Sequence, residues 1–141
     1  MKLMILNGPN LNFLGIREKE IYGNKTYQDL EKYLYEYSKT KNIELLIKQT
    51  NYEGELIDYI QKGYLEQYDG IIINPGALTH YSYSLYDAIL SVKPLKVIEV
   101  HLTDPKLRED FRKKSVISEV CFKTIVGLGF ESYKLAIDEF L

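Results

Sequence analysis

The sequence predicts an α/β protein in which one five-stranded parallel sheet lies between two layers of helices. Five short apolar segments that are typical of strands alternate along the chain with segments whose apolar residues recur at helical spacing. One strand segment, Gly70–Asn74, contains three consecutive isoleucines, as expected for a strand that is buried on both faces. Because strands that alternate with helices are joined by crossovers, this order of elements favours a parallel sheet.

Each predicted strand is a short apolar run that ends at glycine, proline or a polar residue. Asn7-Gly8-Pro9 follows the first run and Pro75-Gly76 follows the third, and these residue types favour turns over continued strands. The predicted strands cover residues 3–6, 43–50, 70–74, 96–100 and 124–126.

Each predicted helix carries an apolar stripe or begins at a capping residue. Thr26 and Asp29 have the spacing of a capping pair, and the apolar residues behind them form one stripe. Ser82 or Ser84 is expected to cap a later helix. The expected helices cover residues 26–37, 55–68, 82–91 and 105–114, and a last helix runs to the C-terminus.

The length of 141 residues is sufficient for one domain with its own core, so we expect residues 1–141 to form a single domain. For a chain of this size, the expected arrangement is a three-layer sandwich with the flavodoxin-like strand order 2-1-3-4-5. Such sheets bind ligands beyond the carboxyl ends of the strands, in the crevice between strands one and three.

The composition excludes several classes of function. A formal net charge of −2 gives no electrostatic basis for binding nucleic acid or an anionic membrane. Cys121 is the only cysteine, which excludes an internal disulfide and a zinc site built on cysteines. No apolar run reaches the roughly 18 residues of a membrane span, so we expect a cytoplasmic protein.

The first loop is unusually long for a small domain. After Asn7–Asn10, roughly 18 residues carry too few periodic apolar positions to form a helix, and such loops are often active-site lids. Arg17 and Tyr22 lie in this loop between Gly15 and Gly23, where hinge motion is easy. The loop therefore predicts a lid that carries an arginine and a tyrosine.

Polar side chains gather at the carboxyl ends of the predicted strands. His80 and His101 are the only histidines of the chain, and both fall at the edge where the fold predicts a crevice. The full set at this edge is Asn10 after the first strand, Asn74 and His80 at the third, and Glu99 and His101 at the fourth.

These residue types favour acid–base chemistry. The chain has no glycine-rich phosphate loop, no acidic cluster for magnesium and no nucleophile elbow, so no metal site is expected. Glu99 and His101 leave the same face of one strand, and a carboxylate there orients the imidazole and favours its protonated form, as a general acid needs. A free phenol, with a pKa of about 10, is a poor base, but a guanidinium such as that of Arg17 stabilises the phenolate of Tyr22. Such a base and acid suit the elimination of water beside a carbonyl.

Five segments together resemble the type II 3-dehydroquinate dehydratases of the shikimate pathway, which serves chorismate and aromatic amino acid biosynthesis. The resemblance implies a flavodoxin-like protomer without a cofactor, and a homododecamer built as a tetramer of trimers. It also implies trans-elimination of water from 3-dehydroquinate, through an enolate, to 3-dehydroshikimate. The segments keep their order and spacing over essentially the whole chain: Asn7–Asn12, Arg17–Gly23, Ile73–His80, Ile98–Leu102 and Arg108–Arg112.

The resemblance also implies roles by position. Tyr22 would take the proton from C2 of the substrate, and Arg17 would hold Tyr22 ionised. His101, paired with Glu99, would protonate the departing C1 hydroxyl, and Asn10 would position a water that stabilises the enolate. The remaining implied substrate contacts are Leu102 and Thr103 at the carboxylate, Asn74, His80 and Arg112 at ring hydroxyls, Arg108 at the lid, and Asp87 from a neighbouring subunit.

Four positions depart from the pattern of that family. Lys19 stands where proline is common, and Tyr81 replaces a smaller residue and would narrow the hydroxyl-binding side. Thr103-Asp104 replaces Ser-Asn, and Thr103 keeps the hydroxyl. Asp104 would repel a carboxylate if it pointed inward, but Asp104 before Pro105 fits an N-cap and a first helical residue, and we expect that role.

Two alternatives remain open from the sequence. A flavodoxin-like binding or signalling module would need a Ser/Thr-rich phosphate loop or an acidic pair with a phospho-accepting aspartate, and this chain has Asn-Gly-Pro-Asn and Asn74-Pro75 at those places. A catalytically degraded relative with a structural role is the second alternative. Single residues also have structural alternatives: Asn10 as a turn former, Asp87 as a surface charge, and Arg108 as a solvent-facing helix residue.

Overall fold

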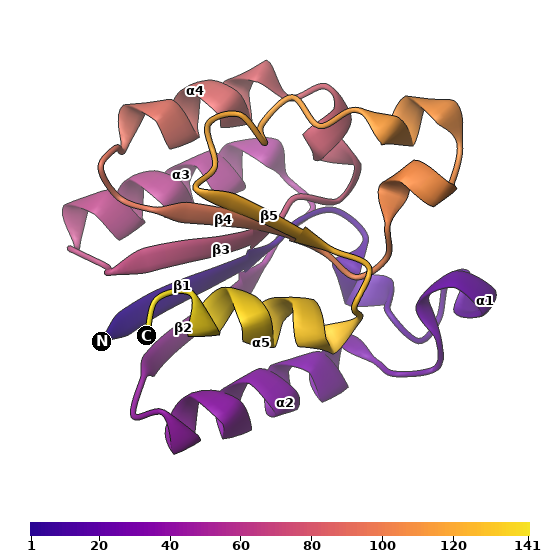
Figure 1. Cartoon of the computed structure of the whole chain (residues 1–141), viewed down its shortest axis with the longest axis horizontal. Coiled ribbons are helices and arrows are strands. Elements are labelled where there is room, and N and C mark those ends of the chain that lie inside the picture. Colours follow the sequence, from indigo (N-terminus) through magenta and orange to yellow (C-terminus); the bar gives the residue numbers. More distant parts are fainter.

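Five parallel strands form one sheet in the computed structural model, which describes residues 1–141. The strands are β1 (Lys2–Asn7), β2 (Glu44–Gln49), β3 (Gly70–Asn74), β4 (Val97–His101) and β5 (Lys123–Val126). Their order across the sheet is β2-β1-β3-β4-β5, and every neighbouring pair is parallel (Figure 1). The predicted flavodoxin-like order is therefore confirmed.

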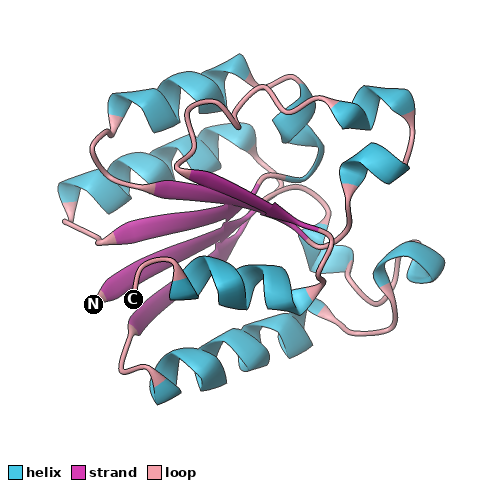
Figure 2. Ribbon diagram, in the orientation of Figure 1, coloured by secondary structure: helices cyan, strands magenta, loops and turns pink.

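Helices cover both faces of this sheet (Figures 1 and 2). One face carries α2 (Tyr27–Thr40) and α5 (Phe130–Asp138), and the other carries α3 (Glu53–Leu65) and α4 (Tyr83–Ser91). Because strand residues alternate between faces, Leu3 and Ile5 of β1 pack in the core under α2 and α5, whereas Met4 and Leu6 pack under α3 and α4. None of the helices has the length and apolar character that a transmembrane span requires.

The helix starts follow the predicted capping residues. Thr26 Oγ1 accepts a hydrogen bond from the Asp29 N–H at 3.1 Å, and the Asp29 carboxylate accepts from the Thr26 N–H at 2.8 Å, so α2 begins with a capping box. Of the two serines that could cap α4, Ser82 does so, since its Oγ accepts a backbone N–H at 3.0 Å. Asp104 Oδ1 accepts the Lys106 N–H at 3.0 Å, which confirms its expected capping role.

The prediction that the first loop contains no helix was wrong. The loop holds a 3₁₀ turn over Leu11–Phe13 and one short helix, α1 (Lys19–Tyr22). A single turn needs no apolar stripe, because local backbone hydrogen bonds such as Tyr22 N–H to the Glu18 carbonyl at 3.0 Å hold it. The turn ends at Gly23, whose φ of 81° suits glycine.

The prediction of one polar helix over residues 105–114 was also wrong. Two 3₁₀ turns, Pro105–Leu107 and Asp110–Lys113, take its place. Arg108 separates them in an extended conformation, with φ −113° and ψ −151°. The break turns the Arg108 side chain, which is only 11% exposed, towards the first loop, so the solvent-facing alternative for this residue is wrong.

Candidate active site

A pocket lies at the carboxyl ends of β1, β3 and β4, where the strand order predicts a ligand site. Its lining includes three arginines and no acidic residue, which suits an anionic ligand. Ten of the predicted site residues line it: Asn10, Arg17, Tyr22, Asn74, His80, His101, Leu102, Thr103, Arg108 and Arg112.

Two arginines contact the Tyr22 hydroxyl in this pocket. Arg108 Nη1 donates to Tyr22 Oη at 2.5 Å, and Arg17 Nη2 donates to it at 3.1 Å. The guanidinium carbons lie 4.7 Å (Arg17) and 5.4 Å (Arg108) from the centre of the phenol ring, so both cations also face its π-system. The phenol oxygen is therefore held between two positive charges.

Glu18 contacts the same two arginines from outside the pocket lining. Its Oε2 accepts from Arg17 Nη2 at 2.9 Å and lies 3.5 Å from Arg108 Nη2. The Arg108 Nε atom is buried and has no hydrogen-bond partner. Buried donors of charged groups rarely stay unpaired, so the Nε N–H of Arg108 is available to donate to a bound ligand.

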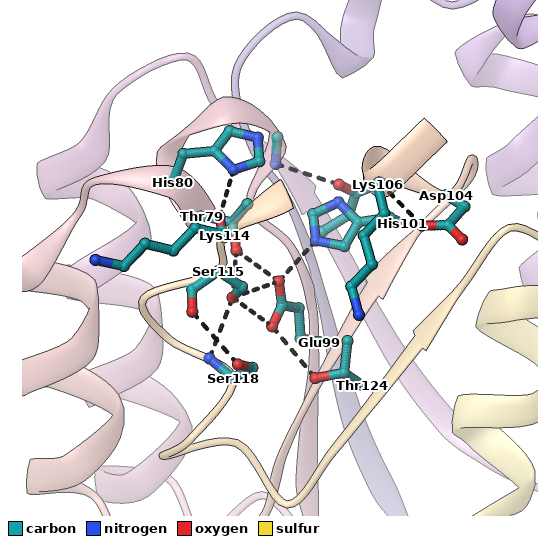
Figure 3. A network of polar contacts seen from close by, with 12 residues as sticks. Thr79, His80, Glu99, His101, Asp104, Lys106, Lys114, Ser115, Ser118 and Thr124 are labelled. Carbon is teal, nitrogen blue, oxygen red and sulfur yellow. Dashed lines mark hydrogen bonds and ion pairs between the residues drawn. The ribbon is translucent and has the colours of Figure 1, made fainter. Parts of the chain in front are cut away.

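Glu99 and His101 form the carboxylate–imidazole pair that their spacing predicts (Figure 3). His101 Nε2 lies 2.7 Å from Glu99 Oε2. Both leave the same face of β4 as Val97, which belongs to the core under α3 and α4. His101 lines the pocket, whereas the Glu99 side chain is fully buried and lies behind it.

Three hydroxyl groups complete the surroundings of the Glu99 carboxylate (Figure 3). Thr79 Oγ1 donates to Oε2 at 2.5 Å, Ser115 Oγ to Oε1 at 3.0 Å and Thr124 Oγ1 to Oε1 at 3.3 Å. Burial would by itself raise the pKa of Glu99, but the hydrogen bonds from His101, Thr79 and Ser115 outweigh burial and hold that pKa below its ordinary value. Glu99 is therefore a buried carboxylate that stays ionised.

A second buried network holds Asn74 at the floor of the pocket. The register of β1 and β3 places Asn7 beside Asn74, and Tyr133 of α5 lies against both. The Tyr133 hydroxyl donates to Asn7 Oδ1 at 2.5 Å and accepts from Asn74 Nδ2 at 2.9 Å, while Asn74 Oδ1 accepts the Gly76 N–H at 3.2 Å. The Asn74 amide is therefore held at both ends, with one N–H left for a ligand.

His80 and Arg112 also line the pocket. His80 Nδ1 lies 2.6 Å from the Lys114 carbonyl oxygen, and because a carbonyl only accepts, Nδ1 carries the hydrogen and Nε2 is left free. Arg112 pairs with Glu109 of its own turn. Tyr81 is 62% exposed and does not line the pocket, so the expectation that it narrows the hydroxyl-binding side was wrong.

Two predicted site residues lie outside the pocket lining. Glu99 stands behind His101, and Asp87 is exposed on α4. Asn10 lies in the lining and is also a turn former, because its φ is 70° and its N–H donates to Asn51 Oδ1 at 2.9 Å.

Sequence reasoning missed the residues that support the site from behind. Thr79 directly precedes His80 and lies in the segment Ile73–His80 that resembles the family, so its position offered a signal. Ser115 and Thr124 are distant in sequence from Glu99, and only the folded chain brings their hydroxyls to it. Tyr133 belongs to the last helix, and its hydrogen bonds to two asparagines could not be inferred from helical spacing.

The sequence is similar to one known protein family over its whole length. A sequence profile of the family described as "Dehydroquinase class II" matches residues 1–141. The chain is 52% identical over 137 residues to the 3-dehydroquinate dehydratase of Clostridium beijerinckii, which covers 97% of this chain and 93% of that protein. It is 54% identical over 134 residues to the 3-dehydroquinate dehydratase of Bacillus pumilus, which covers 95% of this chain and 90% of that protein.

Solved structures agree with these matches. The crystal structure of the type II dehydroquinase from Butyrivibrio crossotus superposes with a TM-score of 0.98 at 54% identity, over 99% of this chain and 97% of that chain. The type II dehydroquinase from Propionibacterium acnes superposes with a TM-score of 0.93 at 36% identity, over 98% of this chain and 94% of that chain. The chain therefore belongs to the class II dehydroquinase family of enzymes.

Proposed function

We propose that this chain removes water from 3-dehydroquinate to form 3-dehydroshikimate, in the shikimate pathway. The observation that carries the proposal is that one pocket holds a tyrosine hydroxyl between two arginines and an imidazole backed by a buried carboxylate. Its relatives are named 3-dehydroquinate dehydratase, and an arginine-rich pocket suits a substrate that carries a carboxylate.

Tyr22 acts as the general base. As a phenolate it takes a proton from C2 of the substrate, and the electron pair of the C–H bond moves to the C3 carbonyl oxygen to form an enolate. Arg17 and Arg108 favour this phenolate, because two positive charges at hydrogen-bond distance stabilise a negative oxygen. A base of this kind contributes about 10²–10⁴-fold to the rate.

The enolate requires a hydrogen-bond donor at its oxygen. Asn10 lines the pocket and positions a water that donates to this oxygen, which stabilises the charge as it develops. No lysine lines the pocket, so nothing there supports a Schiff base with the substrate carbonyl. The enolate route is therefore the one that the lining favours.

His101 acts as the general acid. The ionised Glu99 accepts the N–H of His101 Nε2, so Nδ1 is the nitrogen that gives its proton to the departing C1 hydroxyl. The C1–O bond breaks, water leaves, the enolate returns its electron pair to form the C1–C2 double bond, and the C3 carbonyl is restored. Tyr22 has then gained one proton and His101 has lost one, and exchange with solvent resets both.

The other pocket residues bind the substrate. Thr103 and the backbone of Leu102 receive the substrate carboxylate. Asn74, His80 and Arg112 hold ring hydroxyls. Asn74 has one free amide N–H for this contact, and His80 has a free Nε2. Arg108 adds its unpaired buried Nε. Asp87 acts from a neighbouring subunit of a homododecamer. Residues 1–141 act as one catalytic domain. A cytoplasmic location stays a prediction.

The test is turnover of 3-dehydroquinate by the purified protein, followed through the absorbance of the conjugated enone of 3-dehydroshikimate. We expect turnover by the wild type and a large loss in His101→Ala, because hydroxide is a poor leaving group without an acid. Absence of turnover in the folded wild-type protein would instead support a degraded relative. Sodium borohydride added with substrate should leave activity intact, and a substrate adduct on a lysine would contradict the enolate route.

A further inference from the structure

We propose that Ser115 is a positioning residue for the acid step, and that it acts on His101 through the Glu99 carboxylate. The proposal rests on the proposed function, in which His101 is the general acid. Ser115 does not line the pocket. It lies on the segment between the second 3₁₀ turn, Asp110–Lys113, and the buried Val116.

Ser115 is the hydroxyl that reaches both oxygens of Glu99 (Figure 3). Its Oγ lies 3.0 Å from Oε1 and 3.1 Å from Oε2, whereas Thr79 and Thr124 each contact one oxygen. A hydroxyl that contacts both oxygens holds the carboxylate head in place. The position of Oε2, which receives the His101 N–H at 2.7 Å, therefore depends in part on Ser115.

All the side chains that hydrogen-bond to Glu99 are donors, so the site is built for the ionised carboxylate. A protonated carboxyl would place its own hydrogen against one of these donors. The hydroxyls therefore keep the Glu99 carboxylate ionised. The ionised carboxylate in turn keeps a hydrogen on Nε2 of His101. Nδ1 then remains the nitrogen that exchanges a proton with the substrate.

Ser115 is itself anchored. Its Oγ accepts the Ser118 N–H at 3.2 Å. The preceding residue, Lys114, offers the carbonyl that orients His80 at 2.6 Å. Two consecutive residues of one segment thus orient both histidines of the chain, one through a backbone carbonyl and one through a carboxylate.

The matched variants are Ser115→Ala and Ser118→Ala. Ser118 lies on the same segment, and its hydroxyl does not contact Glu99; its backbone N–H stays in place when the side chain is shortened. A hydrogen bond to a charged group is strong, so Ser115→Ala should lower kcat about tenfold, with KM within about twofold of wild type. Ser118→Ala should match the wild type, and Ser115→Thr, which keeps the hydroxyl, should recover much of the kcat that Ser115→Ala loses.

A double-mutant cycle with Glu99→Gln separates this role from a packing effect. If Ser115 acts through the carboxylate, Ser115→Ala should change kcat by less than about twofold in the Glu99→Gln background. An equal loss in both backgrounds, or the same kcat for Ser115→Ala and Ser118→Ala in an active enzyme, would overturn the inference. Absence of turnover in the wild type would overturn the proposed function first, and the inference with it.

Discussion

Arg108 Nη1 lies 2.5 Å from Tyr22 Oη, although the two residues are 86 positions apart in the chain. The contact joins the segment after β4 to the first loop, and Arg17 of that loop contributes a second cation at 3.1 Å. The Arg108 side chain is 11% exposed and that of Arg17 is 28% exposed, so water screens the Arg108 charge less. The contact that joins these two segments is therefore also one that would stabilise the phenolate of Tyr22 in the proposed mechanism.

Replacing either arginine should slow the proposed proton abstraction by Tyr22. Without one cation the phenolate is less stable, so kcat should fall in both variants, and further in Arg108→Ala than in Arg17→Ala. The measurement is kcat and KM of both variants at one pH. Arg112→Ala is the control, because Arg112 pairs with Glu109 and should change KM more than kcat. A wild-type kcat in Arg108→Ala would contradict the role of this cation.

Glu99 should make the protein more stable above its ordinary pKa than below it. Its folded-state pKa is lowered, so the unfolded chain binds a proton at a higher pH than the folded chain does. The stabilisation is therefore fully present at neutral pH, begins to fall once pH drops below the ordinary value and is lost as pH passes through the folded value.

Urea unfolding from about pH 7 to about pH 3 checks this expectation. The free energy of unfolding of the wild type should fall more steeply over this range than that of Glu99→Gln. Asp29 and Glu109, whose pKa values are also lowered, keep their contribution in both proteins and cancel in the difference. Equal slopes would show that Glu99 is not held ionised by its surroundings.

Tyr133→Phe should weaken both stability and substrate binding. The change leaves Asn7 Oδ1 and Asn74 Nδ2 buried without their partner, which typically costs about 1–3 kcal/mol. It also frees the Asn74 amide, so KM should rise several-fold with a smaller change in kcat. Tyr27→Phe is the control, because Tyr27 touches only the far side of this network, through Asn7 at 3.4 Å, and should leave KM unchanged. Equal KM values in the two variants would refute the role of Tyr133 at Asn74.

Asp87 should affect catalysis only through assembly. It is exposed on α4 and does not line the pocket of its own chain, so a catalytic role requires a neighbouring subunit. We expect sedimentation to show a large closed oligomer, and Asp87→Ala to raise KM without lowering the thermal stability of the protein. A fully active monomer at the assay concentration would remove Asp87 from the site.

The strand order and the position of the pocket could be predicted because the chain alternates strongly between apolar strand runs and amphipathic helices. The pairing of Glu99 with His101 followed from strand periodicity alone. The capping roles of Thr26, Ser82 and Asp104 followed from local hydrogen-bond chemistry, which depends on residues close in sequence.

The wrong predictions concern segments whose structure depends on contacts between distant residues. The helix expected over residues 105–114 is broken at Arg108, where the side chain contacts Tyr22 of the first loop. The hydroxyls around Glu99 come from three separate segments, and no periodicity connects them. Polar support of a site is specified by tertiary contacts, and sequence spacing carries little information about it.

The role of Tyr22 as the base is tested most directly by kcat of Tyr22→Phe, which removes one hydroxyl and keeps the ring. Circular dichroism of the variant establishes that it is folded before its rate is compared with the wild type. If Tyr22 takes the C2 proton, kcat should fall about 10²-fold or more, the contribution of a general base. A folded Tyr22→Phe that retains more than about a third of the wild-type kcat would show that another group is the base.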